Sequence, residues 1–359
     1  MKRVLQKIKL DDYEIVFDEG LTYLNEFLEK KNYSQIIVLV DSHTNQHCYP
    51  QLIQLLPHLK DCPKIITPAG ESNKNLNACE EIWAQMLQVH TDRKAVVLNL
   101  GGGVIGDMGG FVAACYKRGI EFIQIPTTVL SQVDASIGGK LGVDFKYGKN
   151  LIGVFKNPAL VLVSTIWLKT LSKRQTVNGF AEIYKHALIQ SRTQWEHLSK
   201  NLTIPSADFN KILHDSLLIK KEVVEKDPFE KDWRKILNFG HTIGHAVETY
   251  SLENDSEPLL HGEAIATGML MEALIGTITN GFSLEHLRQM EKVLLTQFGH
   301  YQIPKDSHSI IWNMMSMDKK NRGAKVLAVV LKDIGEPVID VEITRELFDR
   351  AVNYYRALA

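Results

Sequence analysis

Five short apolar runs in the first half of the chain constrain its fold more than any other feature. Each run is rich in Val, Ile or Leu and stops at polar or glycine residues; they are Gln35–Ser42 (QIIVLVDS), Lys64–Glu71 (KIITPAGE), Ala95–Gly103 (AVVLNLGGG), Glu121–Thr128 (EFIQIPTT) and Ala159–Thr165 (ALVLVST). This pattern is typical of parallel strands that are buried on both faces of a sheet. Between two of these runs, residues 75–90 show the helical spacing of apolar side chains. The first half is therefore predicted to be a doubly wound α/β domain.

The second half shows a different pattern of apolar residues, because strand-like runs almost vanish after residue 171. Helical patterns follow one another at Gly179–Gln190, Asn210–Glu225, Ile236–Ser251, Gly262–Thr279 and Leu284–Phe298, with one late β-type run at Lys325–Asp333. We therefore expect two domains: an α/β nucleotide-binding domain at residues 1–170 and a mainly α-helical domain at residues 171–359.

Composition favours a cytoplasmic enzyme over several other classes of protein. The chain has 359 residues, a formal net charge of −1 and no apolar run of membrane-spanning length. That charge gives no reason to expect nucleic acid or an anionic membrane as a partner. The four cysteines form no Cys-x-x-Cys pair, and the first residues lack the apolar core of a signal peptide. We therefore expect reduced cysteines and a cytoplasmic location.

A glycine-rich loop follows the run that ends at Leu100. Gly101, Gly103 and Gly106 match the spacing of a dinucleotide-binding loop between a strand and a helix. Glycines let the backbone approach a pyrophosphate closely, and the helix that follows offers free N–H groups. The loop follows a middle strand, whereas the usual loop of this kind follows the first, so a tight turn with close helix packing is an equally good interpretation. Asp41 ends the first strong strand, where a carboxylate can hold a ribose, although alone it is more often a turn or cap residue.

Histidines and a glutamate form a second cluster. His241 and His245 are four residues apart and share one face of a helix, His261 begins a later helical pattern, and Glu182 lies in an earlier one. Imidazoles and a carboxylate form the ligand set that suits catalytic zinc. Spacing alone pairs His241 with His245 as ligands. A hydrogen-bonded helix histidine is the alternative for any one of them, although the glycines beside them suggest a close approach of another group.

A third group consists of basic residues beside glycine, asparagine or other motif-like residues, namely Arg118, Lys140, Lys149, Lys185, Lys220 and Arg234. Most Lys and Arg side chains in proteins are solvated surface. Lys140 and Lys149 differ because adjacent glycines expose backbone N–H donors beside a cation, which predicts binding of an anion such as phosphate.

Taken together, these segments resemble the 3-dehydroquinate synthase family. The matching stretches occur in family order from Asp41 to about Gly335 and are GGGVIGD, KRGIEFIQIPTTVLSQVDASIGGK, GKNLIGVF, LKTL, GFAEIYKHALI, WRKILNFGHTIGHAVE, LHGEAIATGM and DKK. The resemblance implies a phosphorus–oxygen lyase of the shikimate pathway, which leads to chorismate and the aromatic amino acids. Its substrate would be 3-deoxy-D-arabino-heptulosonate 7-phosphate, converted to 3-dehydroquinate and phosphate by transient NAD-dependent oxidation, phosphate elimination, re-reduction and intramolecular aldol closure.

The resemblance also implies a role for individual residues. The zinc ligands (cobalt being a possible substitute) would be Glu182, His241 and His261, which moves His245 from a ligand to a catalytic role. NAD would contact Asp41, Gly70, Glu71, Lys74, Gly103, Val104, Ile105, Gly106, Asp107, Thr127, Thr128, Lys140, Lys149, Leu168, Lys169 and Thr170. Substrate would meet Asp134, Lys140, Asn150, Lys185, Lys220, Arg234, Asn238, His245 and Lys320. Arg118 would reach the phosphate in a neighbouring subunit, so a homodimer is implied.

Three stretches depart from the family pattern without removing a proposed ligand or cation. They are Val143–Lys146, where Asp144 stands after the valine, Tyr184 between Glu182 and Lys185, and Lys173-Arg174-Gln175. The alternatives are another sugar-phosphate cyclase, a metal-dependent polyol dehydrogenase that releases NADH, and a zinc- or nucleotide-binding module without enzymatic activity. The set of lysines for phosphate and the residues Lys220, Arg234 and Asn238 favour the dehydroquinate synthase.

Overall fold

The computed structural model describes residues 6–146, 148–205, 208–316 and 325–358 of the chain. By its internal contacts the chain divides into two compact units, Met1–Ser172 and Lys173–Ala359, here called the N-terminal and C-terminal units. The first is an α/β unit and the second is mainly helical, which confirms the predicted fold class. Among the described residues, no helix combines the length and the apolar character needed to cross a membrane.

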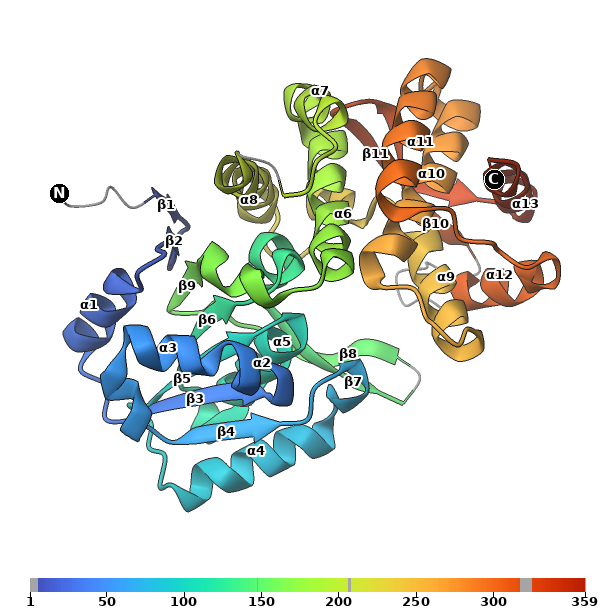
Figure 1. Ribbon diagram of the computed structural model, residues 1–359. Coiled ribbons are helices and arrows are strands. Elements are labelled where there is room, and N and C mark those ends of the chain that lie inside the picture. Colours follow the sequence, from blue (N-terminus) through green and yellow to red (C-terminus); the bar gives the residue numbers. More distant parts are fainter. Residues whose placement is uncertain (1–5, 147, 206–207, 317–324, 359) are drawn as a thin grey trace. The chain divides into compact units, whose positions relative to one another are not determined.

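The described part of the N-terminal unit is built on one seven-stranded sheet (Figure 1). Its strand order is β1 (Gln6–Lys9), β2 (Glu14–Phe17), β9 (Leu160–Val163), β6 (Glu121–Pro126), β5 (Val96–Gly101), β3 (Ile36–Asp41) and β4 (Lys64–Thr67). All neighbouring pairs are parallel except β1 and β2. The five predicted strands are all present, and β5, which leads into the glycine loop, lies inside the sheet.

Helices cover both faces of this sheet because successive side chains of a strand point to opposite sides. Val38 and Val40 of β3 pack in one apolar cluster with residues of α1 (Thr22–Lys31) and α3 (Tyr49–Leu55). Ile37 and Leu39 of the same strand pack in a second cluster with residues of α4 (Leu76–Gln88) and α5 (Gly103–Cys115). The short helix α2 (Ser42–His47) follows β3 directly. The sheet is thus doubly wound, as expected.

A separate hairpin of β7 (Lys140–Phe145) and β8 (Gly148–Phe155) was not predicted. Its second strand is largely exposed and carries apolar side chains such as Leu151 and Phe155 on the surface. The hairpin matters for function because it presents the predicted phosphate-binding lysines, Lys140 and Lys149, on paired strands.

The C-terminal unit is arranged around the helix α10 (His261–Asn280), whose residues from Gly262 to Gly276 are all buried except Glu263. The other helices are α6 (Lys173–Gln190), α7 (Arg192–Lys200), α8 (Phe209–Lys226), α9 (His241–Asn254), α11 (Leu284–Phe298), α12 (His308–Ser316) and α13 (Arg345–Arg356). Helix α10 contacts α6, α9, α11 and α13 and the hairpin of β10 (Val326–Asp333) and β11 (Glu336–Ile343). Because α10 is packed among these elements, its sequence has no stripe of polar residues facing solvent.

One predicted helix begins later than its pattern suggested. The spacing indicated a helix from Ile236, but residues 233–238 form a 3₁₀ turn and α9 starts at His241. Gly240 causes the break because it adopts φ of 80°, a left-handed conformation that favours glycine. His241 is therefore the first residue of α9, and this position shapes the candidate site.

Candidate functional site

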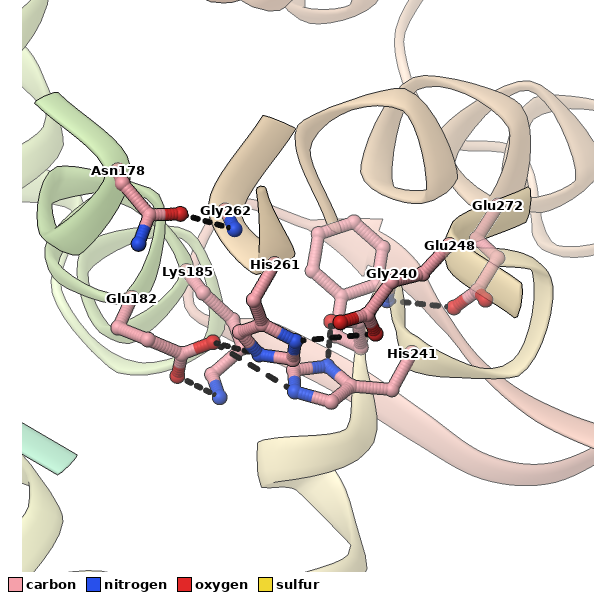
Figure 2. A network of polar contacts seen from close by, with 10 residues as sticks. Asn178, Glu182, Lys185, Gly240, His241, Glu248, His261, Gly262 and Glu272 are labelled. Atoms are coloured by element: carbon pink, nitrogen blue, oxygen red, sulfur yellow. Dashed lines mark hydrogen bonds and ion pairs between the residues drawn. The ribbon is translucent and has the colours of Figure 1, made fainter. Parts of the chain in front are cut away.

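Three helices of the C-terminal unit bring the predicted metal-binding side chains together. Glu182 comes from α6, His241 and His245 from α9, and His261 from the start of α10. One nitrogen from each of the three imidazoles lies within 4.8 Å of the other two. The Oε1 atom of Glu182 lies 3.5 Å from Nε2 of His241 and 3.8 Å from Nε2 of His261 (Figure 2). These distances leave space for an ion between the carboxylate and the rings.

Hydrogen bonds orient two of these histidines. Nδ1 of His241 lies 3.1 Å from the carbonyl oxygen of Phe239, and Nδ1 of His261 lies 3.3 Å from Oε2 of Glu248. Both partners are acceptors, so each Nδ1 donates, and a ring in its neutral form keeps its lone pair on Nε2. The two Nε2 atoms face the Glu182 carboxylate. Two imidazole nitrogens and one carboxylate oxygen form a donor set that fits a divalent transition metal such as zinc.

The electrostatics of the cluster also attract a cation. Although burial opposes its protonation, the carboxylates of Glu182 and Glu248 raise the pKa of His261 to about 9. The other oxygen of Glu182 accepts a short hydrogen bond from Lys185, which lies one turn along α6 and is 1% exposed. The buried carboxylates of the cluster thus attract positive charge. A bound metal ion would supply such a charge.

A cap ties α6 to α10 beside this cluster. The side chain of Asn178 on α6 accepts a hydrogen bond of 2.5 Å from the backbone N–H of Gly262 (Figure 2). A Cβ atom at Gly262 would lie 2.0 Å from the carbonyl oxygen of Asn178. The contact therefore requires glycine after His261, and it fixes the helix that carries Glu182 to the helix that carries His261.

Two buried basic residues and an asparagine lie elsewhere in the C-terminal unit. Lys220 on α8 is 4% exposed and Arg234 is 2% exposed. Arg234 donates through Nη1 to the carbonyl of Pro228 at 2.6 Å, and Asn238 donates to Oε1 of Glu230 at 2.7 Å. Lys320, which was predicted to meet the substrate, lies outside the described residues.

Sequence reasoning missed two acidic residues that organise this segment. Asp227 accepts hydrogen bonds from three backbone N–H groups, those of Lys231, Asp232 and Arg234, and Glu230 is the partner of Asn238. The signal for Asp227 was present, because an aspartate before proline after a long helical pattern marks a turn. Nothing in the spacing pointed to Glu230.

The glycine loop of the N-terminal unit has the predicted place between a strand and a helix. Strand β5 ends at Gly101 and α5 begins at Gly103. A Cβ atom at Gly101 would lie 2.4 Å from the Cβ of Ile105, so tight packing alone already requires this glycine. At Gly103 the nearest atom would be 3.5 Å away. Tight packing thus accounts for Gly101, whereas Gly103 has more room beside it, and dinucleotide binding by the loop stays a prediction.

Lys74 and Asp107 form a buried ion pair beside this loop. Nζ of Lys74 lies 2.6 Å from Oδ2 of Asp107 and 4.0 Å from Glu71. Burial opposes the charge of Lys74, but the carboxylates of Asp107, Glu71 and Asp144 outweigh burial and raise its pKa. The pair joins the segment after Gly70, whose φ is 107°, to the first turns of α5. Two predicted cofactor-contacting segments, residues 70–74 and 103–107, are thereby held together.

The remaining predicted residues of the N-terminal unit lie in turns and on the hairpin. Asp41 caps α2 by accepting from the N–H of Thr44 at 2.7 Å, which is the cap role that sequence offered as the alternative. Thr128 bonds Ser131 after β6. Asn150 on β8 donates its N–H to Asp144 at 2.6 Å. The other predicted residues lie in loops or short helical turns, namely Arg118, Thr127, Asp134, Leu168, Lys169 and Thr170.

Two of the departures from the family pattern have structural roles. Asp144 holds the backbone of Asn150 and faces Lys74. Tyr184 is completely buried, and its ring contacts Phe180, Trp195 and Phe298 in the core behind α6. Tyr184 therefore packs away from the cluster that its neighbours Glu182 and Lys185 form.

Comparisons with known proteins agree with this picture. The family model described as 3-dehydroquinate synthase N-terminal matches residues 64–178, and the one described as 3-dehydroquinate synthase C-terminal matches residues 179–321. The 3-dehydroquinate synthase of Parabacteroides distasonis is 35% identical over 335 residues, which cover 93% of this chain and 94% of that protein. The 3-dehydroquinate synthase of Pelagibacter ubique is 38% identical over 349 residues and 93% of each chain.

Solved structures share the fold at lower identity. A 2-deoxy-scyllo-inosose synthase complexed with carbaglucose-6-phosphate, NAD⁺ and Co²⁺ superposes with a TM-score of 0.86 at 24% identity, covering 99% of both chains. The 2-epi-5-epi-valiolone synthase ValA from Streptomyces hygroscopicus subsp. jinggangensis, with NAD⁺ and Zn²⁺ bound, has a TM-score of 0.85 at 24% identity and covers 99% of this chain and 100% of its own. A glycerol dehydrogenase from Schizosaccharomyces pombe has a TM-score of 0.65 at 13% identity, with 99% of this chain and 91% of that one covered. These likenesses concern the fold.

Proposed function

The chain belongs to the 3-dehydroquinate synthase family, and we propose that it converts 3-deoxy-D-arabino-heptulosonate 7-phosphate to 3-dehydroquinate and phosphate. The observation that carries this proposal is the succession of both family models over residues 64–178 and 179–321. Relatives of that name match over most of their own length, so the likeness extends to the whole enzyme and not to one domain.

Glu182, His241 and His261 are the proposed ligands of a catalytic zinc ion, with cobalt as a possible substitute. The orientation of both Nε2 atoms toward the Glu182 carboxylate supports this set. The raised pKa of His261 also supports it, because it shows that the carboxylates of Glu182 and Glu248 favour a positive charge there. Zinc bound there would supply a Lewis acid for the substrate hydroxyls. Three protein ligands leave one position open to substrate, which is typical of catalytic zinc.

His245 is proposed as a proton-transfer residue and not as a ligand. Its ring centroid lies 5.0 Å from that of His241 and 5.7 Å from that of His261, so it borders the same space. An imidazole has an unperturbed pKa of about 6.5 and exchanges protons with a hydroxyl or phosphate oxygen near neutral pH. Its position on α9, one helical turn after His241, supports this role.

The N-terminal unit is proposed to bind NAD through the glycine loop and its neighbours. Residues Gly103–Asp107 form the first turn of α5, whose free N–H groups suit a pyrophosphate. The other parts of NAD would be surrounded by the Lys74–Asp107 pair and by Asp41, Gly70, Glu71, Thr127, Thr128, Lys149 and Leu168–Thr170. NAD would supply a transient hydride acceptor that is restored in each turnover. The chain's own contribution is to hold the cofactor and to exclude water.

Anionic groups of the substrate would bind to the buried cations. Lys185, Lys220 and Arg234 are each less than 5% exposed, and charged side chains form strong hydrogen bonds with carboxylate or phosphate oxygens. Lys220, Arg234 and Asn238 are proposed for the carboxylate end, while Lys140, Asn150 and Asp134 of the N-terminal unit are proposed for the phosphate end and the ring. The proposed enzyme is cytoplasmic and homodimeric, with Arg118 reaching the phosphate bound by the partner copy.

The decisive experiment measures phosphate release from 3-deoxy-D-arabino-heptulosonate 7-phosphate by the purified protein with zinc and a catalytic amount of NAD. Equal amounts of phosphate and 3-dehydroquinate, without net NADH, are expected. Net accumulation of NADH would instead indicate a polyol dehydrogenase. A sugar phosphate that lacks the carboxylate is the control substrate, and faster turnover of that control would indicate another sugar-phosphate cyclase.

A further inference from the structure

Glu272 is a buried carboxylate to which the proposed reaction assigns no role. It lies on α10 and has no exposed surface. Its Oε2 accepts from the backbone N–H of Gly240 at 2.6 Å (Figure 2). Its Oε1 accepts from the backbone N–H of Ile243 at 3.0 Å. Both oxygens therefore bind the first turn of α9, the helix that begins with His241.

This contact replaces a cap that α9 lacks. The N-cap residue is Gly240, which has no side chain, and no local side chain caps the helix. In a capping box, side chains of the helix itself satisfy the N–H groups of the N-cap residue and of the third helical residue. In α9 these two groups belong to Gly240 and Ile243, and one carboxylate from another helix satisfies both.

The two helices are also in unusually close contact at glycines. A Cβ atom at Gly268 would lie 2.0 Å from the carbonyl oxygen of Gly240, and one at Gly244 would lie 3.0 Å from that of Ala264. Gly268 is one helical turn before Glu272, so the carboxylate binds α9 at the end of this glycine contact. The ring centroids of His241 and His261, the first residues of the two helices, lie 5.5 Å apart.

The negative charge of Glu272 lies at the N-terminus of α9, beside the proposed metal site. His241 is the first residue of α9 and His261 is the first residue of α10. The N-terminus of a helix carries partial positive charge, so two such ends disfavour a metal ion between them. Each end has a carboxylate: Glu272 binds the start of α9, and Glu263 accepts from the N–H of Leu260 at 2.8 Å at the start of α10.

From this geometry we propose that Glu272 is a positioning residue of the metal centre. It holds the first turn of α9 on α10 so that His241 and His261 present their Nε2 atoms to the same ion, and its charge offsets the α9 N-terminus. This inference rests on the proposed zinc site. It assigns Glu272 no contact with metal or substrate.

The test compares the zinc affinity of the Glu272→Gln protein with that of the unaltered protein, by competition with a chromophoric chelator at a temperature where both metal-free proteins are folded. The amide keeps the size of the side chain but turns one acceptor into a donor that faces a backbone N–H. Loss of such an outer partner lowers metal affinity about 10–100-fold. The visible absorption spectrum of the Co²⁺-substituted protein is also expected to change, because His241 moves.

Thr267→Val is the matched control. Thr267 lies on the same helix, is 4% exposed, and its hydroxyl lies 3.2 Å from that of Tyr355 on α13. This variant is expected to lower the unfolding temperature while the zinc affinity and the Co²⁺ spectrum stay unchanged. It separates a general loss of stability from a change in the metal centre.

The possible outcomes are distinct. A Glu272→Gln protein with a lower unfolding temperature but an unchanged zinc affinity and Co²⁺ spectrum overturns the positioning role alone. An unaltered protein that binds no zinc overturns the metal site and this inference together. Should Glu272→Gln fail to fold, Glu272→Asp keeps the charge and shortens its reach; a weaker zinc affinity then supports the proposal, and an unchanged affinity overturns it.

Discussion

Nδ1 of His261 lies 3.3 Å from Oε2 of Glu248, and this contact joins the first residue of α10 to the middle of α9. A carboxylate only accepts, so His261 donates through Nδ1 and keeps Nε2 for the space that faces Glu182. The contact therefore selects the tautomer of His261 that can bind a metal ion.

Replacing Glu248 is expected to weaken zinc binding without removing a ligand. Glu248→Ala removes the partner of His261 and should lower zinc affinity about 10–100-fold, as is usual for such outer partners. Glu248→Gln keeps an acceptor oxygen and should lose less. Chelator competition measures both values, and Glu253→Gln, an exposed residue of the same helix, is the control. Equal affinities for all three variants would contradict this role.

Alanine variants of the histidines distinguish the two possible ligand sets. His261→Ala is expected to lose zinc and nearly all turnover while the protein stays folded, because one of three ligands is gone. His245→Ala is expected to keep zinc and to lose turnover by about 10²–10⁴-fold, the usual contribution of a proton-transfer residue. Metal content after dialysis and phosphate release measure the two effects. A His245→Ala protein that cannot keep zinc would show that pairing His241 with His245 by spacing was right.

The sequence predicted the buried parts of the fold better than the exposed parts. Strands β3, β5, β6 and β9 are apolar runs that are almost wholly buried, so composition alone identifies them. Strand β4 lies at the edge of the sheet, and its side chains alternate between buried and exposed. The hairpin of β7 and β8 lacks that signal because most of β8 is exposed. The start of α9 was placed at Ile236 because apolar spacing continues through the 3₁₀ turn, whereas the backbone changes direction at Gly240.

The residues that bracket the metal cluster were predictable only in part. Glu182, His241, His261 and Glu248 all lie in family stretches, and Glu272 lies outside them. The roles of Glu248 and Glu272 depend on contacts between different helices, which periodicity does not report. One signal for Glu272 was available. It is the sole charged residue between Ala264 and Gly276, inside an otherwise apolar pattern, and a charge in that position needs partners.

The stability contributed by Asp227 is expected to depend on pH. Although partial burial opposes its charge, the N–H groups of Lys231, Asp232 and Arg234 outweigh burial and lower the pKa of Asp227. A carboxyl with a lowered pKa in the folded state contributes stability that is fully present above its unfolded pKa of about 3.9. That contribution is lost as the pH falls through the lower, folded value.

Thermal unfolding of the metal-free Asp227→Asn protein measures this effect. Its unfolding temperature is expected to lie below that of the unaltered protein by a constant amount at neutral and mildly acidic pH, and the difference should shrink below about pH 4. The control is Asp215→Asn, which removes an exposed pair with Lys211 and should have little effect at any pH. A difference for Asp227→Asn that persists unchanged at the lowest pH would contradict the assignment.

A methyl group at Gly268 is expected to damage the metal centre through the packing of α9 on α10. The added Cβ would lie 2.0 Å from the carbonyl oxygen of Gly240 and 2.7 Å from the N atom of Gly244, so backbone and not a flexible side chain must move. Alanine is the better helix former by about 1 kcal/mol, but overpacking typically costs about 1–3 kcal/mol, so a net loss of stability is expected.

The matched control for Gly268→Ala is Ala266→Gly, a buried position on the same helix. It should also lower stability, by about 1 kcal/mol, because glycine is a poor helix former, but it adds no atom against α9. Both metal-free proteins are compared by thermal unfolding and then by zinc competition. Gly268→Ala alone is expected to lose zinc affinity, since separating the helices moves His241 away from His261. If both variants bind zinc as the unaltered protein does, the close glycine contact supports the core of the C-terminal unit and leaves the metal centre unaffected.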